Sequence, residues 1–224
     1  MQDYIIATVL GVASGLALNP IARLQVKKRT QDQNQLNFFK KPIFLLIWPL
    51  ITALIFNALV HFVGPYSNLK TLEYTLYLLP LINIFAIDAL IRKIPNELLL
   101  SILTVRLAFI IIQFIKNGFS IKLLFMSALG MLVAFFVFSI PARLGAFMGA
   151  GDVKFAGVIG FAFGFYDFFQ AMVFMAVLVL FYLAYLLITK KGNLKTATPM
   201  GPYLVIGLVL TMLFPLSELL ARLS

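Results

Sequence analysis

Long apolar runs follow one another along almost the whole chain, and the charged residues lie mostly in the short breaks between them. A helix needs about 20 apolar residues to cross the hydrocarbon core of a bilayer. The runs have roughly this length, so the sequence predicts an all-α membrane protein, a polytopic bundle of about eight transmembrane helices. The expected helices cover residues 3–24, 43–63, 71–92, 97–116, 120–140, 152–166, 168–189 and 200–221.

The composition excludes an ordinary soluble fold. Of the 224 residues, 62% are hydrophobic and 12% are charged, and the mean hydropathy is +1.02. A soluble domain could not cover so much apolar surface with so few charges, so the surplus must face lipid. Because the breaks are short, we expect residues 1–224 to form a single membrane-embedded domain.

The basic residues predict the orientation of the helices, since cytoplasmic loops carry an excess of Lys and Arg. With eight helices and an outward N-terminus, one side of the membrane holds Arg23, Lys27, Lys28, Arg29, Lys40, Lys41, Arg92, Lys93, Arg143, Lys154, Lys190, Lys191 and Lys195. The other side holds only Lys70, Lys116, Lys122 and Arg222. The first side is therefore expected to be cytoplasmic, in a multi-pass protein of the cytoplasmic (inner) membrane.

The longest hydrophilic stretch, residues 25–42, is then a short basic cytoplasmic loop in place of a larger cytoplasmic domain. The net charge of +10 comes from basic residues that cluster in the loops between apolar runs, which is the pattern of membrane orientation. We therefore expect contact with the lipid bilayer and no nucleic-acid partner. The chain has no cysteine and one histidine, His61, which excludes thiol chemistry and a His-rich metal site. Trp48 and His61 are interpreted as residues of the membrane interface.

Two of the eight acidic residues stand out by their expected depth in the membrane. Asp88 lies late in the third expected helix and Asp152 opens the sixth, so each is within one or two turns of the cytoplasmic edge, at about 1.5 Å per residue. An ionisable side chain at such a depth is unfavourable and is by default a functional hypothesis. The other acids are expected near water, at a helix start or between helices: Asp3, Asp32, Glu73, Glu97, Asp167 and Glu218.

The neighbours of the two aspartates predict the local backbone. Ile94 and Pro95 should end the helix of Asp88, because the residue before a proline avoids the helical region. Asn96 can then cap the next helix.

Gly149 and Gly151 precede Asp152 and allow an irregular backbone and the close approach of another chain segment.

A pair of carboxylates that share one proton can activate water, since the ionised member accepts a proton while the protonated member polarises a peptide carbonyl. The helix dipoles favour the proton on Asp88, near a helix C-terminus, and the charge on Asp152, at a helix N-terminus. A separation of 64 residues does not show that the two meet. Buried acids also serve as structural hydrogen-bonding residues or in ion transport.

Several motifs resemble those of the type IV prepilin peptidases, which are GxGD-type intramembrane aspartic peptidases. The sequence GAGDVK at residues 149–154, followed by a glycine-spaced apolar helix, resembles the second active-site motif of that family. Asp88, Arg92 and residues 94–96 resemble its first aspartate motif. Two further stretches resemble the family in the right order, namely Gly15, Asn19, Arg23 and Leu24 near the N-terminus and residues 199–204 near the C-terminus.

The resemblance implies a leader peptidase that cuts the short basic leader of type IV prepilins or pseudopilins on the cytoplasmic side. It implies that Asp88 and Asp152 are the catalytic pair and that Gly149, Gly151 and Lys154 belong to an active-site motif. Proteolysis of this kind needs no cofactor. Many relatives also methylate the new N-terminus with S-adenosylmethionine, but those relatives usually carry paired cysteines where this chain has its cysteine-free basic loop.

Other interpretations remain open at this stage. A GxGD peptidase with another substrate, related to signal peptide peptidase and presenilin, is a second enzyme hypothesis. A membrane transporter or channel subunit could instead use Asp88 and Asp152 to handle ions or protons. Lys154 can tune Asp152 or extend to the membrane interface, and Arg106, deep inside an expected helix, is expected to form a structural pair.

Overall fold

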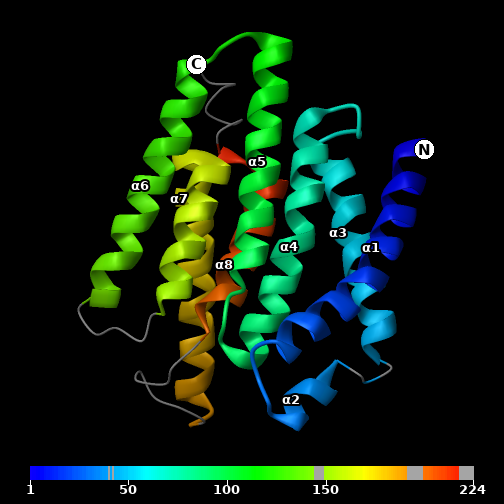
Figure 1. The fold of residues 1–224 in the computed structure, drawn as a ribbon, viewed down its shortest axis with the longest axis vertical. Coiled ribbons are helices and arrows are strands. Elements are labelled where there is room, and N and C mark those ends of the chain that lie inside the picture. The colour runs from blue at the N-terminus through cyan, green and yellow to red at the C-terminus, as the bar shows by residue number, and fades with distance from the viewer. Residues whose placement is uncertain (40, 42, 144–148, 191–198, 217–224) are drawn as a thin grey trace. The chain divides into compact units, whose positions relative to one another are not determined.

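The computed structural model describes residues 1–39, 41, 43–143, 149–190 and 199–216, and all regular secondary structure in these ranges is helical (Figure 1). The helices are α1 (Gln2–Lys27), α2 (Gln33–Phe38), α3 (Ile43–Phe62), α4 (Leu69–Ile91), α5 (Asn96–Asn117), α6 (Ile121–Arg143), α7 (Ala150–Ile188) and α8 (Met200–Leu213). The predicted all-α fold is confirmed.

Six of these helices are long and apolar enough to cross a membrane: α1, α3, α4, α5, α6 and α7. Large apolar side chains on them are widely exposed, for example Leu46 at 75% and Ile115 at 80%, as expected of a surface that faces lipid. α8 is a shorter apolar helix, and α2 has only six residues. The predicted number of about eight apolar helices is therefore too high, and the described ranges contain about seven.

The count differs because the sixth and seventh expected helices form the single element α7. α7 is broken at Gly164, whose backbone is non-helical with φ 76° and ψ 178°. Glycine adopts a positive φ without the steric penalty of a side chain. Figure 1 shows the chain turning back on itself at this break. Asp167, which was expected to separate two helices, lies just beyond the break and is buried. The end of the last expected helix, residues 217–221, lies outside the described residues.

The chain divides into two compact units. Unit 1 comprises Met1–Ile111 and Met212–Phe214, and unit 2 comprises Ile112–Thr211 and Pro215–Ser224.

In unit 1, α1 packs against α3 through two glycines. A Cβ atom at Gly11 would lie 2.5 Å from Ala53 Cα, and one at Gly15 would lie 2.5 Å from Pro49 Cα, so neither position can carry a side chain. The Thr52 hydroxyl donates a hydrogen bond to the Gly11 carbonyl at 2.6 Å. Small residues of this kind let membrane helices approach closely.

Two hydrogen bonds, the α1–α4 ties, link α1 and α4 through residues at or just beyond the helix ends in unit 1. At one end, Asp3 Oδ1 accepts a hydrogen bond from the Tyr66 backbone N–H at 3.2 Å. At the other, Lys93 Nζ donates to the Arg29 carbonyl at 3.1 Å. α1 and α4 therefore run in the same direction. We refer to the second end, which carries Arg29, Arg92 and Lys93, as the basic end of unit 1.

A buried ion pair joins α4 to α5 within unit 1. Arg106 Nη1 lies 2.9 Å from Glu73 Oε1, and the Tyr77 hydroxyl donates to the same oxygen at 2.7 Å. Glu73 is 4% exposed and Arg106 is 8% exposed. The expectation that Glu73 lies near water is wrong, because its charge is satisfied inside the protein. The structural pair expected for Arg106 is present.

In unit 2, α6 and α7 cross where two glycines meet. A Cβ atom at Gly160 would contact the Gly130 carbonyl group and lie 2.8 Å from Ala134 Cβ. A similar contact occurs between Gly207 of α8 and the Ala171 carbonyl of α7, at 2.5 Å from the position of a Cβ atom. The glycine-rich part of α7 thus packs against protein, as its composition predicts.

Candidate functional site

Asp88 lies in the last turn of α4, and its side chain is 4% exposed. The helix ends directly after it because Arg92 adopts the left-handed conformation, with φ 51° and ψ 43°, and its N–H donates to the Asp88 carbonyl at 2.9 Å. The expected helix ended at residue 92, ahead of Ile94 and Pro95, so its predicted end agrees with the structure to within one residue. Asn96, predicted as a cap, is the first residue of α5, and no capping hydrogen bond of its side chain occurs among the described contacts.

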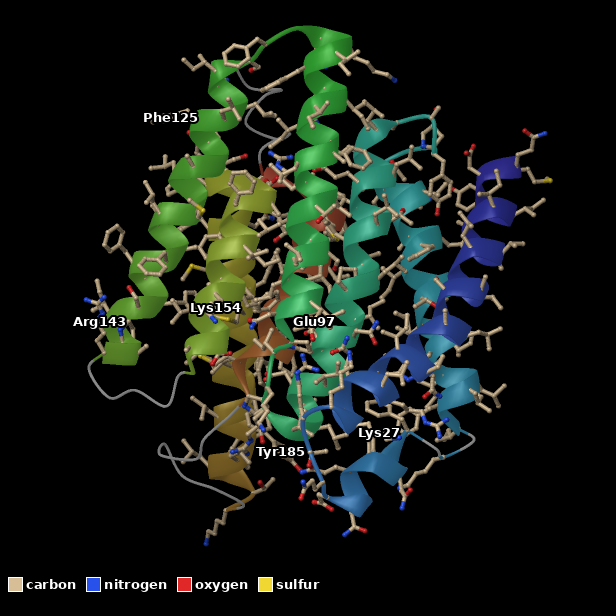
Figure 2. All side chains as sticks on the ribbon, in the orientation of Figure 1. Lys27, Glu97, Phe125, Arg143, Lys154 and Tyr185 are labelled. Carbon is tan, nitrogen blue, oxygen red and sulfur yellow. The ribbon has the colours of Figure 1, made fainter. Side chains whose placement is uncertain are left out.

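The turn after Asp88 is fixed to the end of α1 by charged side chains. Arg29 forms an ion pair with Glu97, which lies in the first turn of α5. Lys93, in the turn itself, donates to the Arg29 carbonyl as one of the α1–α4 ties. Figure 2 shows Lys27 of α1 and Glu97 of α5 at the same end of unit 1. The basic end of unit 1 therefore surrounds the turn that follows Asp88 with a defined set of contacts.

Asp152 lies in the first turn of α7 and is partly buried. Its carboxylate Oδ2 accepts a hydrogen bond from the Gly149 N–H at 2.9 Å. Gly149 precedes the helix with an extended backbone, φ −83° and ψ 157°. A carboxylate in this position satisfies one of the free N–H groups at a helix start. As the sequence predicted, Asp152 lies at the start of a helix, and Gly149 is not yet helical.

The other residues of this motif surround the start of α7. Gly151 is already in the helix and has an ordinary negative φ. Lys154 is exposed, and Figure 2 shows it near the same end of unit 2 as Arg143 of α6. No described hydrogen bond or ion pair includes Lys154, so its exposed side chain fits the interpretation of an amine that extends to the membrane interface.

Among the described residues, no group of three or more His, Asp or Glu side chains could hold a metal ion. The two candidate catalytic residues are carboxylic acids, one at the C-terminal end of α4 and one at the N-terminal start of α7. Asp88 belongs to unit 1 and Asp152 to unit 2, and each is described within its own unit. Carboxyl groups of this kind can carry out acid–base chemistry.

A scan against protein families matches residues 75–187, half of the chain, to the type IV leader peptidase family. This chain belongs to the type IV leader peptidase family. The matched segment begins within α4, ends in the last turn of α7 and contains both Asp88 and Asp152. The predicted resemblance to prepilin peptidases is thereby confirmed at the level of the family. A search of curated proteins and a search of solved structures each return no match.

Sequence reasoning missed the ion pair that holds the turn after Asp88. Arg29 and Glu97 were both expected near the cytoplasmic edge, but 68 residues separate them and only the fold shows that they pair. Asn19 was singled out only as part of the resemblance, and it is one of the most deeply buried polar residues, at 2% exposed. Trp48, interpreted as an interface residue, is also buried.

Proposed function

We propose that this leader peptidase is an aspartic endopeptidase in which Asp88 and Asp152 form a catalytic pair. Its substrates would be type IV prepilins or pseudopilins, cut between the leader and the mature chain. The observation that carries the proposal is that the segment matched to the leader peptidase family contains two aspartates, each at the end of an apolar helix. The distribution of basic residues supports an active site near the cytoplasmic face of the inner membrane.

In the proposed reaction, Asp152 is ionised and accepts a proton from a water molecule, whose oxygen attacks the carbonyl carbon of the scissile peptide bond. Asp88 holds the shared proton and donates it to the carbonyl oxygen. The tetrahedral intermediate then collapses, the C–N bond breaks and a proton passes to the leaving amine, so that one water is consumed. The same residue pair returns to its starting protonation.

The helix ends support this division of roles. A helix N-terminus stabilises a negative charge and a C-terminus disfavours one, by about 0.3–1 kcal/mol each. Burial of Asp152 opposes its charge, and the hydrogen bond from the Gly149 N–H offsets part of that cost. The reaction needs no metal and no cofactor, and S-adenosylmethionine would be required only for a separate methylation of the new N-terminus.

Co-expression with a prepilin that carries a short basic leader tests the proposal. We expect Asp88→Asn and Asp152→Asn each to lower the rate of leader removal by about a thousandfold or more. Asp32→Asn is the matched control, because Asp32 is exposed and only caps α2 through the Asn34 N–H. Full processing by both dyad variants would refute the proposal, and ion or proton flux without cleavage would indicate a transporter. The mass of the mature N-terminus shows whether a methyl group is added.

A further inference from the structure

Five buried polar side-chain atoms of unit 1 form no hydrogen bond within the described part of the chain, and three of them lie in α1, α3 and α4. These three are Asn19 Oδ1 in α1, Trp48 Nε1 in α3 and Asn83 Oδ1 in α4. The three side chains are between 2% and 7% exposed. The large majority of buried polar side-chain atoms form a hydrogen bond to protein or to ordered water, so these three exceptions require an explanation.

The two asparagines lie at the same level of neighbouring helices. α1 and α4 run in the same direction and pack against each other. The α1–α4 ties at their two ends join residues that are 63 and 64 positions apart in the sequence. Asn19 and Asn83 are also 64 positions apart. Both carry a buried amide oxygen that accepts no hydrogen bond within the described part of the chain.

Trp48 is expected at about the same height along the helices as the two asparagines, to within one helical turn. The contact between Gly15 and Pro49 aligns α1 with α3, and the two helices run in opposite directions. One turn beyond Gly15, Asn19 is therefore expected at the height of Leu45, which is three residues from Trp48 in the sequence. α3 also packs against α4, so all three helices contact one another. An indole ring is long enough to bring its N–H across such an offset.

Prolines add further polarity to this part of the unit. A proline lies inside each of the three helices, at Pro20 in α1, Pro49 in α3 and Pro80 in α4. A proline has no N–H, so the carbonyl group four residues before it loses its helical donor. In membrane proteins, ordered water is one of the groups that satisfy such carbonyls.

We propose that Asn19, Trp48 and Asn83 bind an internal water molecule between α1, α3 and α4. Water has two hydrogens to donate and two lone pairs to accept. It would donate one hydrogen to each asparagine oxygen and accept the indole N–H, which makes the three hydrogen bonds typical of a buried water. A divalent cation does not fit, because calcium and magnesium take six or more oxygen ligands and an N–H group would point toward the ion.

The proposed water lies close to the helix end that carries Asp88. Five residues separate Asn83 from Asp88, which corresponds to roughly 7.5 Å along α4. If the proposed peptidase function holds, each cleavage consumes one water in an apolar environment. The site would then hold a water molecule on the helix that carries the catalytic residue. This role rests on the proposed function, whereas the existence of the water site does not.

A high-resolution structure of the full chain in lipid tests the site directly. We expect one density peak within hydrogen-bond distance, about 2.7–3.2 Å, of both asparagine side chains. A direct hydrogen bond between the amides of Asn19 and Asn83, with no peak between them, would overturn the proposal. This measurement uses the wild-type protein and does not depend on whether any variant folds.

Fluorescence gives a second readout, because Trp48 is the single tryptophan of the chain. We expect Asn19→Leu and Asn83→Leu to expel the water and shift the emission of Trp48 to shorter wavelengths. Asn57→Leu is the matched control, since Asn57 lies in the same helix cluster but already donates to Thr8 Oγ1 at 2.9 Å and to the Ala53 carbonyl at 2.8 Å. Unchanged Trp48 emission in both Asn19→Leu and Asn83→Leu would contradict the proposal.

Kinetics separate the site from its role in hydrolysis. We expect Asn83→Leu to lower kcat for leader cleavage about tenfold with little change in KM, while Asn57→Leu leaves kcat close to wild type. Equal kcat values in the two variants would overturn the role in hydrolysis and leave the binding site standing. A wild-type protein that cuts no leader would instead refute the proposed function, and the structural and fluorescence results would still decide on the water.

Discussion

Both units bring helices close together at glycines, but unit 1 adds polar side chains that pair across helices. In unit 1, polar side chains reach from one helix to the next, as in the buried pair of Glu73 and Arg106 and in the bond from Thr52 to the Gly11 carbonyl. In unit 2, the closest contacts are between backbones, where Gly130 of α6 meets Gly160 of α7. Each unit carries one of the two candidate catalytic aspartates.

The difference extends to the aspartates themselves. Asp88 is buried in a helix whose two ends are tied to α1, whereas Asp152 is partly buried and is held by the Gly149 N–H of its own helix start. A buried ion pair is satisfied in only one alignment of two helices, so it can define the register of α4. Close packing at glycine defines the distance between helices and has no directional bond to fix their register. Unit 1 therefore combines glycine packing with a buried ion pair, whereas the closest described contacts of unit 2 depend on the small size of its glycines.

The largest effect on stability is expected at the buried ion pair. Arg106→Leu leaves the Glu73 carboxylate buried without its partner, and we expect a loss of about 3–5 kcal/mol in the free energy of unfolding. The double variant Glu73→Leu with Arg106→Leu removes both charges and should lose much less. Thermal unfolding in detergent, followed by Trp48 emission, measures both. Equal losses in the single and double variants would show that pairing does not control the register of α4.

A smaller loss is expected from enlarging a glycine in unit 2. Gly160→Ala places a methyl group against the Gly130 carbonyl and should destabilise the protein by about 1–3 kcal/mol. Gly157→Ala is the control one turn away, because a Cβ atom there would have no neighbour within 4 Å. That substitution should be neutral or stabilise α7 by up to about 1 kcal/mol. If both variants unfold at the same temperature, close backbone packing is not what holds α6 to α7.

A gain of up to about 1 kcal/mol is expected at the end of α4. Arg92 is a non-glycine residue with a φ of 51°, a conformation that glycine adopts without steric penalty. Arg92→Gly should therefore raise the unfolding temperature relative to Arg92→Ala, which also removes the side chain but keeps the strain. The comparison isolates the backbone term. If the alanine variant is as stable as the glycine variant, strain at this position does not contribute to the end of the helix.

The helices and the two aspartates could be predicted because they depend on local sequence. Runs of apolar residues indicate where spans lie, and a scarce acid near a span end is visible without knowing the fold. The burial of Glu73 could not be predicted, since it depends on Arg106 of another helix. The break in α7 was expected near residue 167 and occurs at Gly164, because the apolar run continues through it and a single backbone angle decides the position.

The smallest effect is expected at the exposed ion pair between Arg29 and Glu97. Their side chains are 19% and 54% exposed, so Glu97→Gln should cost only about 0.2–1 kcal/mol of stability, and added salt should weaken the wild-type pair. The exchanged pair, Arg29→Glu with Glu97→Arg, should restore most of that loss. The buried pair of Glu73 and Arg106 is the comparison, because high salt should leave its contribution to stability almost unchanged. If Glu97→Gln lost as much stability as Arg106→Leu, the exposed pair would hold the turn after Asp88 as firmly as the buried pair holds α4. Burial would then no longer explain how unit 1 positions Asp88.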